Sequence, residues 1–95
     1  MRADALRGRL RTADTVIYAV FDGKGMLLDT QTGVYFGLDA IGTHIWELLQ
    51  EGTTRDALVR QLLSEYEVDE PQLAADVETF LRALAAKNLI QAVDA

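Results

Sequence analysis

The spacing of hydrophobic residues changes near residue 39. Before that point, short runs rich in β-branched and aromatic residues alternate with glycine-containing turns, a pattern typical of antiparallel strands. Residues 15–22, 25–29 and 34–38 are the three runs, and we expect each to be a strand. The pair Asp22–Gly23 predicts a tight hairpin between the first two, because glycine accepts the positive φ that such turns require. A meander of this kind leaves the third strand at an edge of the sheet.

After residue 39, apolar residues recur every three or four positions, which predicts three amphipathic helices. Asp39 is expected to cap the first helix and Gly52 to end it. Residues 53–56, Thr-Thr-Arg-Asp, resemble a capping box and open the second. Residues 69–72 open the third, because proline is tolerated in a first turn and acidic residues suit the positive helix end. Asn88 is the expected C-cap of this helix.

Neither the meander nor helices of this length can bury their apolar faces alone. We therefore expect one α+β domain with a winged-helix-like arrangement, an N-terminal three-stranded antiparallel sheet followed by three helices. The domain is expected to span residues 15–95, with Leu89 and Ile90 beginning a short terminal strand. Residues 1–14 are expected to form an N-terminal arm, since chain termini tend to be loosely held.

Composition and charge restrict the functions that are possible for this chain. The 95-residue chain suits one domain, and its hydrophobic and charged fractions of 49% and 25% are those of a folded globular protein. It lacks cysteine, which excludes disulfides and thiolate metal sites, and it has no apolar run of the roughly 18 residues that a membrane span needs. Residues 1–14 carry four arginines and two aspartates, so the remainder carries a net charge of −8. We expect a cytoplasmic protein that binds neither nucleic acid nor membrane.

The groups that could catalyse a reaction lack the partners that their chemistry needs. His44 is the single histidine, so it has no second histidine with which to build a metal site or a catalytic pair. Gly23 and Gly25 resemble a phosphate-binding loop, but a strand follows them where such a loop needs a helix. Ser64 lies in a helix without an apparent base, and helix capping and solvation explain the acidic residues between positions 65 and 70. We therefore expect no enzymatic activity, no cofactor and no metal.

A binding function remains possible, and the distribution of charge restricts the ligands that the chain can bind. A winged-helix layout suggests DNA, but the third helix carries more acidic than basic residues, which opposes contact with phosphates. The edge strand at 34–38 lacks the lysine or proline that usually blocks such an edge, and an extended peptide can pair with it by β-augmentation. The alternative is that the N-terminal arm or a second copy of the chain covers this edge. The residues alone leave both open.

Residues 25–46, GMLLDTQTGVYFGLDAIGTHIW, resemble the signature of PqqD-like domains, also called RiPP recognition elements. That signature is a leucine-rich strand, an acidic residue before a glycine turn, an aromatic strand, Leu-Asn/Asp, a small position and Ile-Trp. Residues 74–81 and 87–90 are similar to the closing helix of the family and its Leu-Ile ending. The resemblance spans residues 15–92. The family usually has asparagine at Asp39 and glycine at Asn88, and both replacements keep a capping residue.

The resemblance implies a non-catalytic adaptor that binds the leader segment of a ribosomally made precursor peptide. The leader is expected to add a strand beside residues 34–38, in a groove walled by the third helix. The implied binding residues are Val34, Tyr35 and Phe36 on the strand and Asp76, Thr79, Phe80 and Ala83 on the helix. Asp76 and its acidic neighbours suit a leader that carries lysine or arginine.

Within this family, the chain resembles the free-standing leader-binding proteins of lasso-peptide biosynthesis. This likeness implies a monomer that works with a leader peptidase and a cyclase. Two other functions remain open, a winged-helix regulator that binds protein or DNA and a dimerising module whose edge strand pairs with itself.

Overall fold

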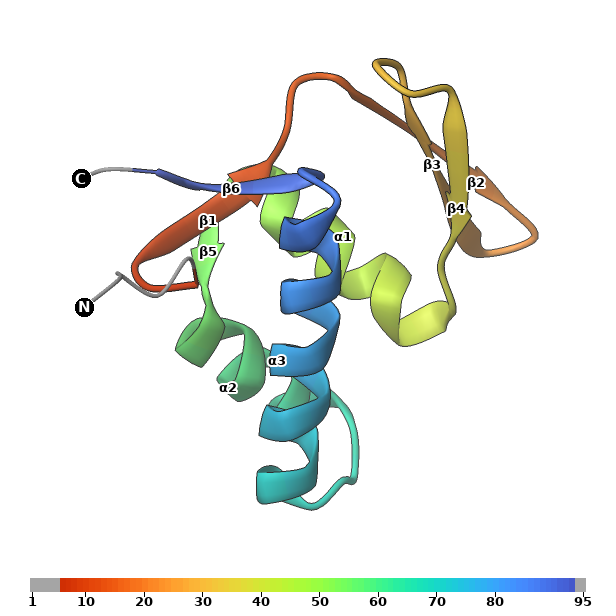
Figure 1. The fold of residues 1–95 in the computed structure, drawn as a ribbon. Helices are drawn as coiled ribbons and strands as arrows, with labels where there is room; N and C mark the ends of the chain where they lie inside the picture. The colour runs from red at the N-terminus through yellow and green to blue at the C-terminus, as the bar shows by residue number, and fades with distance from the viewer. Residues whose placement is uncertain (1–5, 94–95) are drawn as a thin grey trace.

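The computed structural model describes residues 6–93 of the chain. These residues form two three-stranded antiparallel sheets and three helices. Figure 1 shows the two sheets on opposite sides of the molecule, with the helices between and below them. The first helix, α1 (Ala40–Glu51), contacts both sheets, through β1 (Arg9–Thr12) on one side and β3 (Lys24–Asp29) on the other. The expected α+β class is confirmed.

One sheet is the meander that the sequence pattern predicts. It consists of β2 (Val16–Phe21), β3 and β4 (Val34–Gly37), in the order β2-β3-β4. Asp22 and Gly23 have φ values of 54° and 78° in the first turn, so the glycine carries the positive φ expected of it. The third strand, β4, lies at an edge, as predicted.

The second sheet is not predicted from the sequence. It has the order β5-β1-β6, where β5 is Thr53–Thr54 and β6 is Ile90–Val93. Strands therefore precede, separate and follow the helices, so the winged-helix order of one sheet followed by three helices is not confirmed. The short terminal strand expected near Leu89 and Ile90 is confirmed as β6, and it pairs with β1.

The segment expected to be an N-terminal arm, residues 1–14, contains β1, the middle strand of this second sheet. Leu6 and Leu10 within it are each only 1% exposed and belong to the core. Arginine alternates with leucine here, so the strand buries Leu10 while Arg9 and Arg11 stay exposed. Residues 6–12 are thus part of the folded domain, and residues 1–5 lie outside the described part of the chain.

The helices begin where the sequence predicts. Asp39 accepts a hydrogen bond from the N–H of Gly42 at the start of α1, and Thr54 and Asp69 cap α2 (Arg55–Glu65) and α3 (Glu70–Ala86) in the same way. The C-cap of α3 is Lys87, one residue before the expected Asn88, and Asn88 follows it with a φ of 60°, the left-handed conformation common directly after a helix. No helix within residues 6–93 has the length and apolar character needed to cross a membrane.

The hydrophobic core lies among the three helices, β1, β3 and β6. Trp46 of α1 is its largest fully buried side chain, and leucines supply most of the rest. The buried apolar residues are Leu6, Leu10, Leu27, Leu38, Ile45, Trp46, Leu49, Leu58, Val59, Leu62, Leu73, Val77, Leu81, Leu84, Leu89 and Ile90. On its α3 side this core supports a groove beside β4.

Candidate functional site: a groove between β4 and α3

The outer edge of β4 has no strand beside it in the part of the chain that the structure describes, since β4 pairs only with β3. The N–H of Leu38, next after β4, donates to Gly25 O at 2.9 Å and therefore points toward β3. Antiparallel ladders alternate the direction of backbone groups along a strand, so the N–H of Phe36 also points inward. The N–H groups of Tyr35 and Gly37 consequently face the free edge.

The side chains of β4 alternate between the two faces of the sheet. Phe36 is opposite Leu27, which is fully buried, and lies on the face that meets α3. Tyr35 is opposite Leu28 on the other face and is 65% exposed. Lys87, the C-cap of α3, holds its Nζ 5.8 Å from the centre of the Phe36 ring. Phe36 of β4 therefore lies beside the C-terminal end of α3.

Two cavities follow α3 along this groove. The first, which we call the Phe36 cavity, lies between β4 and the C-terminal half of α3 and has a volume of about 170 Å³. Its lining is mostly apolar, with one cation at the rim. The lining residues are Phe36, Gly37, Leu38, Phe80, Ala83, Leu84, Lys87 and Leu89.

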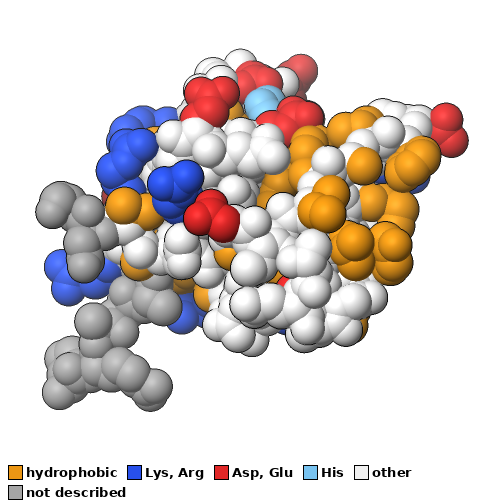
Figure 2. All heavy atoms as spheres, turned by 90° about the horizontal axis from the view of Figure 1, so that it is seen from above, with side chains coloured by type: hydrophobic (Ala, Val, Ile, Leu, Met, Phe, Trp, Pro, Cys, Tyr) orange, Lys and Arg blue, Asp and Glu red, His pale blue; other side chains and the backbone are white. Residues whose placement is uncertain are grey.

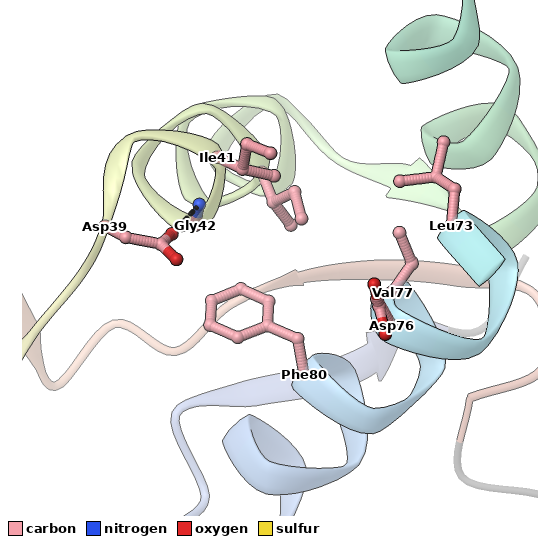
Figure 3. A pocket seen from close by; sticks show the side chains of 8 residues that line it. Asp39, Ile41, Gly42, Leu73, Asp76, Val77 and Phe80 are labelled. Carbon is pink, nitrogen blue, oxygen red and sulfur yellow. Dashed lines mark hydrogen bonds between the residues drawn. The ribbon is translucent and has the colours of Figure 1, made fainter. Parts of the chain in front are cut away.

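The second, the Asp76 cavity, lies between the start of α1 and the N-terminal half of α3 and has a volume of about 250 Å³. Figure 3 shows the Phe80 ring pointing from α3 toward the first turn of α1, with Asp39 on one side and Asp76 on the other. The lining residues are Asp39, Ile41, Gly42, Ile45, Leu73, Asp76, Val77 and Phe80. Phe80 borders both cavities, which therefore lie next to each other along α3.

Gly42 permits the close approach of Phe80 to α1. A Cβ atom at position 42 would lie 3.3 Å from Phe80 Cζ and 3.0 Å from Asp39 Oδ1. Both distances are tighter than ordinary van der Waals contact, so a larger residue would push against the ring or the cap. The small residue at this position therefore allows Phe80 and the Asp39 cap to pack closely against the first turn of α1.

The structure places six of the seven candidate residues along this groove. Val34, Tyr35 and Phe36 form its β4 edge, while Asp76, Phe80 and Ala83 line its cavities. Thr79 instead lies on the adjacent flank of α3, in a separate depression with Ala74, Ala75, Glu78 and Arg82. The helical turn of 3.6 residues explains the difference, because Thr79 is rotated by about 100° from Phe80.

Sequence reasoning missed several groove residues. Lys87 continues the helical spacing from Phe80 and Ala83, so the pattern contained a signal for it. Ile41 and Gly42 come from a different element, and only the packing of α1 against α3 brings them to the site. The single histidine, His44, is not among the lining residues. Its Nδ1 lies 3.5 Å from Glu65 Oε1 of α2.

Charges lie at the two ends of the groove. Asp76 accepts a hydrogen bond of 2.9 Å from Gln72 Nε2, one helical turn earlier. One carboxylate oxygen of Asp39 accepts the hydrogen bond that caps α1. Lys87 is the cation at the opposite end. Within residues 6–93, no group of three or more histidine, cysteine, aspartate or glutamate side chains is placed to hold a metal ion. The groove offers backbone donors, apolar cavities and two charged ends, which are the means of binding an extended chain.

These features define a small α+β domain with an open strand edge beside a helical groove. The family model described as Coenzyme PQQ synthesis protein D (PqqD) matches residues 24–90, which contain the whole groove. The chain belongs to this family. The resemblance to PqqD-like domains that the sequence shows is thereby confirmed.

Two solved structures are similar to this chain. "TbiB1 in Complex with the TbiA(beta) Leader Peptide" is 44% identical, with a TM-score of 0.81 over 90% of this chain and 99% of that one. "Lasso peptide synthetase B1 complexed with the leader peptide" is 25% identical, with a TM-score of 0.77 over 85% of this chain and 95% of the other. Among curated proteins, none matches this chain.

Proposed function

We propose that this protein is a non-catalytic adaptor that binds the leader segment of a ribosomally made precursor peptide, of the lasso-peptide type, by strand addition to β4. The observation that carries the proposal is the open β4 edge beside the α3 groove. Two similar proteins, one of them 44% identical, are described as complexes with a leader peptide, which supports the same ligand here.

Strand addition suits the geometry of the edge. The outward N–H groups of Tyr35 and Gly37 provide main-chain hydrogen bonds to any extended peptide, whatever its sequence. Alternate side chains of the added strand point toward α3, where the Phe36 and Asp76 cavities receive them. Burying one such apolar side chain fully is worth about 1.5–3 kcal/mol. The cavities therefore provide the selectivity that the backbone contacts lack.

Delivery to an enzyme requires a second surface, and the outer face of the β2-β3-β4 sheet offers one. Ile17, Leu28 and Tyr35 lie side by side across the three strands, and Ile17 and Tyr35 are 56% and 65% exposed. Phe21, at the end of β2, is also 65% exposed. Figure 2 shows hydrophobic side chains gathered at this end of the molecule, away from the basic residues at the opposite end.

An exposed apolar patch of this kind is a feature of protein-binding surfaces. The open outer face of this sheet suits packing against a sheet of another protein, at the spacing of about 10 Å that such sheets adopt. We assign this face to contact with the leader peptidase or the cyclase. Holding leader and enzyme on two faces of one adaptor raises their effective concentration. Because the precursor is made on ribosomes, we place the adaptor in the cytoplasm.

The experiment that tests leader binding removes one backbone hydrogen-bond donor from the edge of β4. Tyr35→Pro removes an N–H that faces the open edge, and proline is tolerated at sheet edges. We expect calorimetry with the TbiA(beta) leader peptide to show at least a tenfold loss of affinity, with the melting curve retained. Tyr35→Ala keeps the N–H and removes the outward side chain, so it should bind nearly as well as the wild type. Equal binding by both variants would contradict strand addition at β4.

The alternatives make different predictions. A DNA-binding regulator would form a saturable complex with duplex DNA at physiological salt, which the net charge of −6 opposes. A self-pairing module would change its elution volume with concentration in size-exclusion chromatography. The adaptor is expected to remain a monomer and to leave DNA unbound.

A further inference from the structure

The groove has opposite charges at its two ends. Asp76 lines the cavity near the start of α1, and Lys87 lines the cavity beside β4. Neither side chain has an ion-pair partner within residues 6–93. Asp39 adds a second carboxylate to the Asp76 end. Apolar lining residues, including Phe80, lie between the two charges, so the groove has an anionic rim at one end and a cationic rim at the other.

The distance between the rims corresponds to a short piece of strand. Asp76 and Lys87 are eleven positions apart along α3 and its C-cap, which is about 16 Å at the rise of an α-helix. An extended peptide covers that distance in about five residues. A peptide bound in the groove therefore passes both charges within one short segment.

The charges also distinguish the two directions in which a strand can bind. The chain runs from β4, beside Lys87, to Asp39, beside the Asp76 cavity. A strand that pairs antiparallel to β4 runs the other way and enters at the Asp76 end. Antiparallel pairing is the slightly more stable arrangement and matches the rest of this sheet. The N-terminal part of the bound segment then lies near Asp76.

We propose that Asp76 and Lys87 are specificity-determining residues that select a leader with a basic residue about five positions before an acidic one, on either side of its apolar anchors. This inference rests on the proposed leader binding and adds a charge order to it. A leader with the reverse order meets like charges at both ends of the groove. The charge order therefore favours one direction of the strand and weakens the binding of peptides that carry the reverse order.

Both side chains are exposed, so each contact is worth a modest amount. Exposed ion pairs contribute about 0.2–1 kcal/mol, which corresponds to about 1.5- to 5-fold in affinity per end. Reversing both charges of the peptide removes two attractions and adds two repulsions, so we expect at least about a tenfold difference between the two orders. The difference should shrink in 1 M salt, where the Debye length falls to about 3 Å.

The test is a substitution scan of the TbiA(beta) leader peptide, with lysine, glutamine and glutamate placed in turn at each position. Binding to the wild type should be strongest with lysine at one position and with glutamate about five positions later. Asp76→Asn should abolish the preference at the first position only, and Lys87→Gln at the second only. Glu67→Gln and Lys24→Gln change the same charges at exposed sites outside the groove, and both should keep the wild-type pattern.

Each outcome separates this inference from the proposed function. A parent peptide that binds with no position sensitive to Asp76→Asn or Lys87→Gln would overturn the charge order and leave leader binding intact. A lysine preference that lies after the glutamate preference would overturn the assigned direction. Failure of the parent peptide and all its variants to bind would count against leader binding itself.

Discussion

Thr43 Oγ1 accepts a buried hydrogen bond of 2.7 Å from the backbone N–H of Gly25. This bond joins α1 to β3, the middle strand of the sheet that carries the β4 edge. Gly25 is at this position because a Cβ would lie 2.7 Å from Tyr18 Cε1 and 3.1 Å from the same hydroxyl. The groove is therefore positioned by a contact that lies outside it.

Replacing the hydroxyl tests this contact. Thr43→Val keeps the shape of the side chain but leaves the N–H of Gly25 buried without its partner, which typically costs about 1–3 kcal/mol. Urea unfolding followed by the fluorescence of Trp46, the single tryptophan and 1% exposed, measures the loss. Thr43→Ser keeps the hydroxyl and should lose less. A valine variant as stable as the wild type would show that the bond does not hold the sheet.

A second prediction concerns the stability of the protein at high pH. Tyr18 donates a hydrogen bond of 2.7 Å to Glu47 Oε2. Burial, together with the bond to Glu47 and its negative charge, raises the pKa of Tyr18 from 10.0 to about 12. The folded protein thus holds this proton more tightly than the unfolded chain does. The stabilisation is complete below pH 10 and is lost as the pH rises from 10 to about 12.

Tyr18→Phe removes the titrating group and is the comparison for this prediction. The wild type should lose more unfolding free energy than the variant between pH 10 and 12, measured by urea unfolding at each pH. Tyrosinate absorbance should show a component near pH 12 that disappears in the variant. Parallel pH profiles for the two proteins would show that Tyr18 does not control this range.

A third prediction distinguishes the surface that contacts the enzyme from the surface that binds the leader. Phe21→Ser removes an aromatic side chain that is 65% exposed on the outer sheet face, so the stability should change by less than about 0.5 kcal/mol. Leader affinity should stay unchanged, while association with the leader peptidase or cyclase weakens. Val68→Ser changes a residue that is 43% exposed in the loop between α2 and α3, and it should preserve both activities. Weakened enzyme association in both variants would argue against a dedicated sheet surface.

Elements governed by local chemistry could be predicted from the sequence. The meander follows from β-branched runs and glycine turns, and the helix starts follow from Asp39, Thr54 and Asp69, whose side chains cap the nearest backbone N–H groups. These features depend on residues within a few positions of one another. They need no knowledge of the rest of the fold.

The second sheet depends on contacts that the local pattern does not contain. In β1 the run Arg-Leu-Arg-Thr shows one buried leucine between two exposed arginines, too short a pattern to distinguish a strand from an arm. Thr54 of β5 pairs with Arg9 of β1 and also caps α2. The sequence pattern around Thr54 indicates only the helix cap, so it does not predict that Thr54 is also a strand residue. The pairing of β1 with β6 joins segments from the two ends of the chain.

The candidate site also combines features that the local sequence pattern predicts with features that it does not. The β4 edge and the α3 positions Asp76, Phe80 and Ala83 follow from strand and helix periodicity. Periodicity alone did not exclude Thr79, because the orientation of α3 is set by its packing on other elements, chiefly α2 and β6. The contributions of α1 to the groove could not be predicted from the local pattern for the same reason.

The central claim is that the leader occupies the groove between β4 and α3, and a pair of matched tryptophan substitutions tests it most directly. Ala83→Trp fills the Phe36 cavity, whereas Thr79→Trp places the same side chain on the adjacent flank of α3, outside both cavities. Both residues are exposed, so both variants should fold. Calorimetry with the TbiA(beta) leader peptide should show at least a tenfold loss of affinity for Ala83→Trp, about 1.4 kcal/mol or more, and wild-type affinity for Thr79→Trp. Wild-type affinity in Ala83→Trp, or an equal loss in both variants, would contradict the assignment of the groove.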